Sequence, residues 1–308
     1  MQSNMTQETH DQDSIFNAGK TCSVSIVEMQ SGPSKQDIVR TGTRVDGSQW
    51  IMVADGHGNN TVTDALRGQN WDEVMNMEDH FQYIEQMVKD LGDTSGSGAT
   101  MSTVIMAPDG FHCKWRGDST IKIFENGAEV FSAMPHNQTH DEEATRMSRN
   151  VVPDNRSFAI KVLSPTELTM DPSNYYVVGT KKNRWGQEMS DNMAMTNALG
   201  HNGGSGGVAE EAFIPKTSCA EYSVVVATDG LWDMICEEDT DILATSTATE
   251  LADIATARWG QEWDYTYPNP RVYRGTDQEH TIQTSKQIMG KDQMDDIGVA
   301  VWREGVRE

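Results

Sequence analysis

Residues 50–58 are WIMVADGHG, an apolar run that ends in an acidic, glycine-rich loop. Trp50 to Ala54 predict a buried strand, and this strand delivers Asp55 into a loop of two glycines and a histidine. A carboxylate at a strand end, next to backbone that a ligand can approach closely, can present oxygen atoms to a hard cation. Because Asp-Gly is also a common turn dipeptide, this stretch alone is a weak signal.

Two later stretches repeat the same design. The apolar run from Ser223 to Thr228 predicts another strand, and it ends in Asp229-Gly230. The pair Asp295-Asp296 precedes a last strand, Ile297 to Trp302. Aspartates at the ends of three predicted strands suggest one metal site. Carboxylate and carbonyl oxygens without clustered His or Cys favour Mg²⁺ or Mn²⁺ over zinc.

The composition limits the classes of partner. The chain has 308 residues with 47 Asp and Glu against 24 Lys and Arg, a formal net charge of -23. So negative a surface argues against nucleic acid or an anionic membrane as partner. We expect a monomer that concentrates cations in a carboxylate-lined cleft.

The cellular location is predicted from what the sequence lacks. No apolar stretch approaches the length of a membrane span, and the polar N-terminus has no signal-peptide core. The four cysteines are scattered without paired spacing, which favours a reducing compartment. We therefore expect a cytoplasmic or nuclear protein that is neither secreted nor membrane-spanning.

The hydrophobic pattern predicts a mobile tail at residues 1–20, followed by a single domain at residues 21–308. Strands are expected around residues 22–26, 38–41 and 50–54, with an antiparallel meander over 100–132. Helices are expected over residues 74–91, 141–147, 191–199 and 242–255, with a polar loop over 259–279 and a final helix before the last strand. The pattern over residues 150–187 is weak, and three prolines interrupt it.

This order of elements predicts an α+β fold. Two antiparallel sheets, each with helices on its outer face, would bury both apolar faces and form a four-layer α-β-β-α sandwich. One domain is favoured because the three aspartates must meet in space.

The chain resembles a metal-dependent Ser/Thr protein phosphatase of the protein phosphatase 2C type. The resemblance extends from about residue 20 to the end and rests on an ordered set of fragments. They are Gln36-Asp37, VADGHG (53–58), Ser97-Gly98-Ala99-Thr100, Gly117-Asp118-Ser119, Asn197-Ala198-Leu199-Gly200, ATDGLWD (227–233) and Asp295-Asp296.

The resemblance implies hydrolysis of phosphoserine and phosphothreonine in phosphoprotein substrates, by direct attack of a water that bridges two Mg²⁺ or Mn²⁺ ions. It implies that Asp55 bridges the ions and that Asp229 and Asp295 complete the first. It also implies that the Gly56 carbonyl and Asp37 face the second, some of these ligands through water.

The resemblance also suggests roles for three further residues. His57 would donate a proton to the leaving oxygen, although a purely local hydrogen bond is the alternative. Asp118 and Asp233 match residues that hold a third ion in some relatives, or they are structural, in a turn and at a helix cap.

The chain departs from the family pattern at several positions. Gly32 stands where the family usually has a phosphate-clamping arginine, and Lys35, Arg40 or Lys20 could substitute for it. His201 stands where an aspartate often follows Ala-Leu-Gly. Three hypotheses therefore stay open: an active protein phosphatase, a non-catalytic relative that acts as a binding or regulatory module, and a hydrolase of small phosphate esters.

Overall fold

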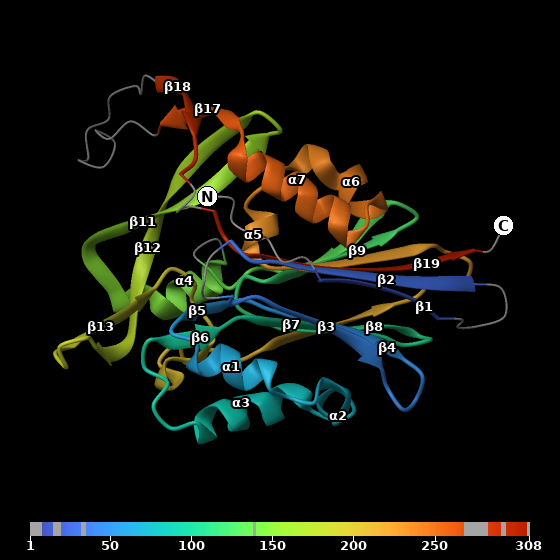
Figure 1. The fold of residues 1–308 in the computed structure, drawn as a ribbon, viewed down its shortest axis with the longest axis horizontal. Coiled ribbons are helices and arrows are strands. Elements are labelled where there is room, and N and C mark those ends of the chain that lie inside the picture. Colours follow the sequence, from blue (N-terminus) through green and yellow to red (C-terminus); the bar gives the residue numbers. More distant parts are fainter. Residues whose placement is uncertain are drawn as a thin grey trace.

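Two antiparallel β-sheets face each other at the centre of the molecule (Figure 1). The computed structural model describes residues 8–14, 20–31, 35–137, 140–267, 283–290 and 294–306. The six-stranded sheet has the order β1-β2-β19-β16-β9-β10, and a five-stranded sheet has the order β15-β8-β7-β4-β3. Their bounds are β1 (Glu8–Ser14), β2 (Lys20–Met29), β3 (Ile38–Thr43), β4 (Gln49–Ala54), β7 (Met101–Met106), β8 (Gly110–Arg116), β9 (Thr120–Glu125), β10 (Ala128–Ser132), β15 (Glu210–Pro215), β16 (Tyr222–Ala227) and β19 (Ile297–Val306).

The continuous apolar runs of β4 and β16 are explained by burial on both faces of each sheet. In β4, Ile51 and Val53 pack into the core between the two sheets, while Trp50 and Met52 face the helices outside. β16 divides in the same way, so that Val224 lies between the sheets and its neighbours lie under the other helical layer. Each strand therefore contributes to two cores.

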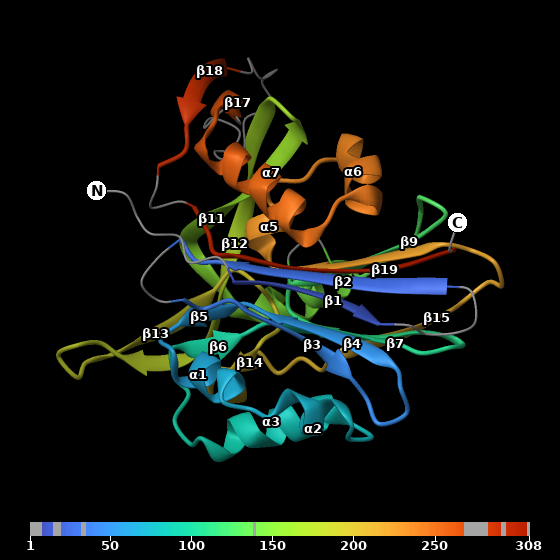
Figure 2. The same ribbon diagram turned by 45° about the vertical axis from the view of Figure 1, so that its right-hand side comes forward.

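Helices cover the outer face of each sheet (Figures 1 and 2). On the five-stranded sheet lie α1 (Thr61–Arg67), α2 (Trp71–Met75) and α3 (His80–Asp90). On the six-stranded sheet lie α5 (Asp229–Trp232), α6 (Thr240–Thr245) and α7 (Ala248–Gly260). The predicted four-layer α+β sandwich is thereby confirmed.

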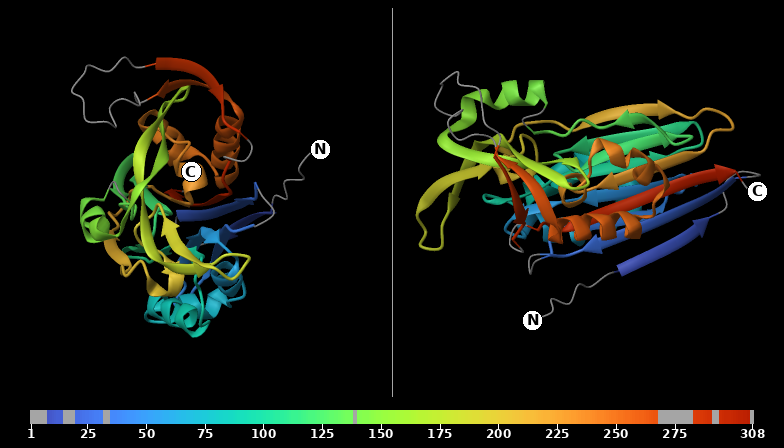
Figure 3. Two further views of the ribbon diagram at one scale, coloured as in Figure 1. Left: turned by 90° about the vertical axis from the view of Figure 1, so that its left-hand side faces the viewer. Right: turned by 90° about the horizontal axis from the view of Figure 1, so that it is seen from above.

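A third sheet lies at one end of the sandwich (Figure 3). It contains β11 (Val151–Ser164), β12 (Glu167–Lys182), β13 (Glu188–Met193), β17 (Glu262–Tyr267) and β18 (Gln283–Ile288). A small sheet of β5 (Gly56–Gly58), β6 (Ser97–Ala99) and β14 (Leu199–Gly200) lies at the same end (Figure 1). The helix α4 (Asp141–Met147) has the predicted bounds, and it continues into a 3-10 turn, η1 (Ser148–Asn150). Two more 3-10 turns are η2 (His201–Gly203) and η3 (Glu237–Asp239).

The third sheet corrects several expectations. The predicted helix over 191–199 is wrong: residues up to Met193 form β13, in which Asp191 and Met193 are both buried, the alternation of a strand. The predicted loop over 259–279 contains β17, and β18 takes the place of the final helix. β13 and β18 are polar, and each pairs with a single strand of this sheet in the described part of the chain, so their sequences carry little hydrophobic periodicity. β17 lies between β12 and β18 and buries Trp263, but it is only six residues long.

Two further expectations need correction near the N-terminus. Within the predicted tail, Glu8–Ser14 form β1, which pairs with β2 by backbone hydrogen bonds that a polar sequence can also make. The single helix expected over residues 74–91 is two helices, because the Asp79 side chain accepts a hydrogen bond from the Gln82 amide and caps a new helix there.

Among the described residues, no helix combines the length and the hydropathy needed to cross a lipid bilayer.

The contact between α7 and α5 gives the first prediction. The Trp259 indole donates to the Gly230 carbonyl at 2.8 Å from a buried position. Trp259→Phe would leave that carbonyl unsatisfied, so we expect the free energy of unfolding in urea to fall by about 1–3 kcal/mol. Trp185→Phe is the matched control, since this indole is 70% exposed and the change should leave stability unaltered. Equal stability of the two variants would contradict the prediction.

Candidate metal centre

Strand register brings the predicted aspartates to one end of the sandwich. Ile38 pairs with Ala54, so that Asp37 before β3 lies beside Asp55 after β4. Ala227 pairs with Thr120 on one side and with Val299 on the other. The segment that follows β16, which carries Asp229 and Asp233, therefore meets Asp118 before β9 and Asp295 before β19. Residues far apart in the sequence form one acidic cluster.

The backbone of Asp55 is held by polar side chains of the same end. The Thr100 amide donates to the Asp55 carbonyl at 2.8 Å, and the Thr100 hydroxyl accepts from the Asp55 amide at 3.2 Å. The same hydroxyl lies 2.5 Å from the hydroxyl of Ser119, the neighbour of Asp118. This network couples the position of Asp55 to that of the Asp118 turn.

Asp37 is fixed by a residue that the sequence did not single out. The Thr228 hydroxyl donates to Asp37 Oδ2 at 2.8 Å and accepts from the Gly298 amide at 2.9 Å. Thr228 lies inside the ATDGLWD fragment, directly before Asp229, and that position was its only signal. From α1, Arg67 donates to the Lys35 and Asp37 carbonyls and so braces the loop before β3.

The adjacent residues Asp295 and Asp296 differ in their burial and in their contacts. Asp296 is buried and accepts from the Ser31 amide at 2.6 Å, the Ser31 hydroxyl at 2.9 Å and the Gln36 amide at 3.1 Å. Asp295 is exposed and only its Oδ1 contact with the following amide, at 2.8 Å, is seen among the described residues. Asp296 therefore anchors the loop that leads to Asp37, and Asp295 keeps its charge available.

The glycines in the cluster allow close approach of the backbone. A Cβ at Gly230 would lie 1.9 Å from the Asp296 carbonyl oxygen, so only glycine fits between Asp229 and the start of β19. A Cβ at Gly56 would lie 2.1 Å from the Thr63 hydroxyl. The Gly56 carbonyl thus belongs to a segment packed tightly against α1, beside Asp55.

Burial and mutual repulsion raise the carboxyl pKa values of the cluster. Burial is the largest cause for Asp37, Asp55 and Asp229, whose pKa values lie well above the ordinary range, and neighbouring carboxylates add to it. The same causes raise the pKa of Asp118 to about 6 and that of Asp233 to about 8. The pKa of Asp295 is also raised, because its carboxyl group is desolvated by the surrounding segments although the residue as a whole is exposed, and then because Asp296 is adjacent. Without a cation, this arrangement costs stability.

The donor set fits divalent cations that prefer oxygen. Asp37 Oδ1, Asp118 Oδ1 and Asp229 Oδ1 are buried and have no hydrogen-bond partner in the described part of the chain. Buried carboxylate oxygens are normally satisfied, so these three atoms are suited to ligands from outside the chain. No three acidic, His or Cys side chains of the described residues already enclose a metal position. Ligation partly through water is consistent with that spacing.

His57 does not face a carboxylate of the cluster. Its Nε2 lies 2.7 Å from Nε2 of His201, whose Nδ1 lies 2.6 Å from Asp191 Oδ2. Burial, and then the proximity of His201, lower the pKa of His57 to about 3. The imidazole is therefore neutral at pH 7 and has no proton in excess to give to a leaving group. The sequence marked His201 only as a departure from the family pattern, and it did not predict this contact.

The cationic residues that could bind the substrate phosphate differ in whether their charge is already paired. Lys35 is exposed, with a backbone φ of 51°, at the edge of the acidic cluster. Arg40 is engaged with Glu28 at 2.7 Å and with the Val39 carbonyl. Gly32 and the side chain of Lys20 lie outside the described residues. Among the described candidates, Lys35 is the one whose charge is not already used.

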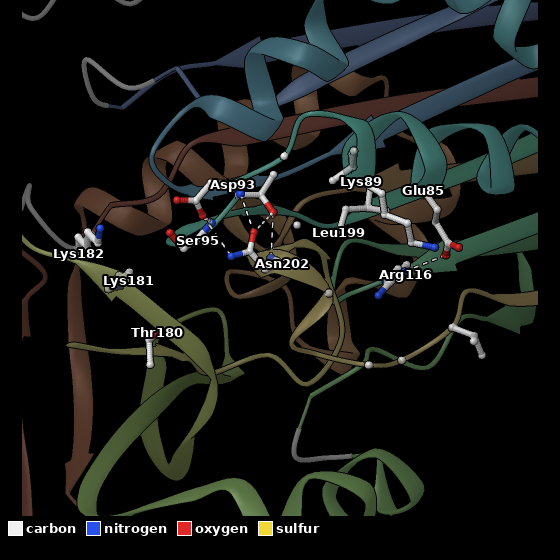
Figure 4. Close-up of a pocket in the computed structure, with 18 of the residues that line it drawn as sticks. Glu85, Lys89, Asp93, Ser95, Arg116, Thr180, Lys181, Lys182, Leu199 and Asn202 are labelled. Atoms are coloured by element: carbon white, nitrogen blue, oxygen red, sulfur yellow. Dashed lines mark hydrogen bonds and ion pairs between the residues drawn. The ribbon is translucent and has the colours of Figure 1, made fainter. Parts of the chain in front are cut away.

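A cavity of about 950 Å³ borders the loop that carries Asn202, the residue after His201 (Figure 4). Its wall carries four cationic side chains, from Lys89, Arg116, Lys181 and Lys182, and three acidic ones, from Glu85, Asp93 and Glu188. Arg116 is paired with Glu85 at 2.8 Å, and Lys181 with Asp191 at 3.0 Å. The wall is therefore mixed in charge and lacks the acidic excess of the chain as a whole.

Comparison with known proteins identifies the fold. No family model and no curated protein matches the sequence. Serine-threonine phosphatase 2C from Toxoplasma gondii superposes with a TM-score of 0.56 at 14% identity, over 97% of this chain and 99% of that one. A sex-determining protein of C. elegans superposes with a TM-score of 0.53 at 15% identity, over 94% of this chain and 66% of that one. The chain has a phosphatase 2C-like fold, as its motifs indicated.

Cation binding should stabilise the folded protein. A ligand that binds only the folded state at a hundred times its Kd adds about 2.7 kcal/mol. We expect Mn²⁺ or Mg²⁺ to raise Tm above its value in EDTA. Asp229→Asn should have a higher Tm than the wild type in EDTA, because it removes repulsion, and a smaller rise with metal. Asp253→Asn, an exposed change on α7, is the control and should behave as wild type. A full metal-induced rise in Asp229→Asn would contradict the assignment.

The raised pKa of Asp233, about 8, predicts a pH dependence. Between its unfolded value and about 8, the folded state holds more protons than the unfolded state, so stability falls as pH rises. His57 and His80, with pKa values lowered by desolvation to about 3 and 4, have the opposite effect below the ordinary imidazole range. Between pH 6.5 and about 8, the titration of Asp233 therefore lowers stability without an opposing contribution from these two histidines.

In EDTA, the free energy of unfolding in urea should fall across this window. The fall should be smaller in Asp233→Asn, which cannot ionise. A profile that is flat in the wild type, or identical in the two proteins, would show that Asp233 does not titrate as the structure indicates.

Proposed function

We propose that this protein is a Mg²⁺- or Mn²⁺-dependent phosphatase that hydrolyses phosphoserine and phosphothreonine in protein substrates. The observation that carries the proposal is the gathering of six aspartates at one end of the sandwich, three of them with buried, unpartnered oxygens. A purely structural cluster would pair these oxygens with donors. The phosphatase 2C-like fold adds support, since it is the fold of a serine-threonine phosphatase.

In this proposal the metal ligands are Asp37, Asp55, the Gly56 carbonyl, Asp229 and Asp295. Asp118 and Asp233 would serve a third, weaker ion. Two bound ions would supply positive charge for the phosphoryl oxygens and would acidify the attacking water. The residues around the ligands would position them: Thr228 donates to Asp37, Thr100 holds the Asp55 backbone, and Asp296 anchors the loop that leads to Asp37.

Substrate binding would rely on cations near the cluster. Lys35 is exposed at its edge and would meet the phosphate as a point charge, with one contact where an arginine fork makes two. The cavity beside the His201 loop, whose wall includes Lys89 and Lys182, would offer these two cations to acidic residues that flank the phosphorylated side chain. The four cysteines are free, in keeping with phosphoproteins of the cytoplasm or nucleus as substrates.

A non-catalytic binding module is the alternative, and one observation favours it. His57 contacts His201 and is neutral, so the proton donor implied by the resemblance is not in place. The retention of all the acidic ligands favours catalysis, because a module that had lost activity would have no need to maintain a cluster that costs stability.

The test is hydrolysis of a phosphothreonine peptide by the purified protein with Mn²⁺, with Mg²⁺ and with EDTA. We expect turnover only with metal. Asp229→Asn should reduce kcat/KM at least about a hundredfold, since loss of a ligand removes several kcal/mol of transition-state stabilisation. The control Asp253→Asn should keep full activity.

Two outcomes would contradict the phosphatase proposal. Turnover that persists in EDTA, or in Asp229→Asn, would exclude the acidic cluster as the catalytic site. Metal binding in calorimetry without any turnover would favour the binding module.

A further inference from the structure

A chain of side-chain contacts leads from the third sheet to His57. Lys181 Nζ lies 3.0 Å from Asp191 Oδ1, and Asp191 Oδ2 lies 2.6 Å from Nδ1 of His201. His201 Nε2 then meets His57 Nε2 at 2.7 Å. Asp191 and His201 have side chains only 2% and 3% exposed, so this chain is shielded from water at its centre.

The donors and acceptors in this chain follow from Asp191. Burial opposes ionisation of Asp191, but hydrogen bonds from His201, the Gly96 amide and Lys181 outweigh it and lower its pKa. As a carboxylate it can only accept, and therefore His201 donates through Nδ1–H. In the neutral form with Nδ1–H directed at Asp191, His201 has a lone pair at Nε2, and in that form the hydrogen between the two rings belongs to His57 Nε2.

The local backbone allows the rings of His57 and His201 to meet. A Cβ at Gly98 would lie 2.4 Å from Nε2 of each histidine, so a side chain there would separate the rings. The ring planes differ by 13°, with centroids 4.9 Å apart, as two rings facing edge to edge require. His201 has a φ of 49°, in the left-handed region that few residues with a side chain occupy. Such a conformation persists only where the surroundings enforce it.

We propose that Asp191 and His201 are positioning residues that hold His57 as its Nε2–H tautomer, with the Nδ1 lone pair free as an acceptor. His57 Nδ1 is buried and has no hydrogen-bond partner among the described residues. The ring belongs to the segment that carries Asp55 and the Gly56 carbonyl. Its catalytic meaning rests on the proposed function: His57 would accept a hydrogen bond from water or substrate, and would not donate to the leaving oxygen.

Two substitutions of His201 test its effect on the His57 tautomer while the fold is kept. His201→Asn keeps a donor near Nδ1 for Asp191 and tolerates the left-handed backbone, but it removes the group that faces His57. His201→Gln places an amide oxygen near the position of Nε2, so it can still accept from His57. Both variants should keep the metal-dependent rise in Tm, since neither changes a proposed ligand.

The direct readout is the tautomer of His57, from ¹⁵N chemical shifts of histidine-labelled full-length protein at pH 8 in EDTA. His57→Gln assigns the signal. We expect the Nε2–H form in the wild type and in His201→Gln, and a mixture of tautomers in His201→Asn. A wild-type His57 that is protonated at Nδ1, or a tautomer that does not respond to His201→Asn, would overturn the proposal.

Phosphopeptide hydrolysis tests the catalytic part separately. His201→Asn should lower kcat about tenfold or more, with KM within about twofold, and His201→Gln should recover most of the loss. An unchanged kcat in a His201→Asn protein with a mixed tautomer would overturn the catalytic role. If the wild type has no turnover, the proposed function fails, while the NMR result still decides whether Asp191 and His201 set the tautomer.

Discussion

Repulsion among buried carboxylates is the constraint on which the rest of this structure depends. Asp37, Asp55 and Asp229 each have a pKa well above the ordinary range, because burial and the neighbouring acids both disfavour ionisation. A fold can hold such groups together only if its framework is rigid and stable without them. Two facing sheets with helices on both outer sides provide that framework, and the cluster lies at one end, where strands terminate.

The positions of the acids are enforced by residues that are not themselves candidate ligands. Thr228 and Gly298 hold Asp37, Thr100 and Ser119 link Asp55 to the Asp118 turn, and Asp296 ties the preceding loop to β19. Each hydrogen bond joins segments far apart in the sequence, so a change in one strand register would disperse the cluster. Stability and site geometry are thus coupled through these polar contacts.

Much of the fold follows from local patterns. The continuous apolar runs of β4 and β16 predicted buried strands, and the Asp-Gly dipeptides that follow them indicated where the chain would turn. β11, β12 and β17 were not predicted, because prolines interrupt the sequences of β11 and β12 and the few buried side chains, such as Leu168, Tyr176 and Trp263, are separated by polar residues. Asp79 divided a region with helical periodicity into two helices, because a capping contact outweighs periodicity.

The sequence by itself determined the identities of the candidate ligands: Asp55, Asp229 and Asp295 through acidic residues at the ends of apolar runs, and Asp37 and Gly56 through the resemblance to the phosphatase 2C family. Only the tertiary structure decided which member of Asp295-Asp296 is a loop anchor, and which partner His57 contacts. Both depend on residues more than a hundred positions away, Ser31 for Asp296 and His201 for His57. Hydrogen-bond direction and the tautomer that follows from it are properties of such contacts, and no local pattern encodes them.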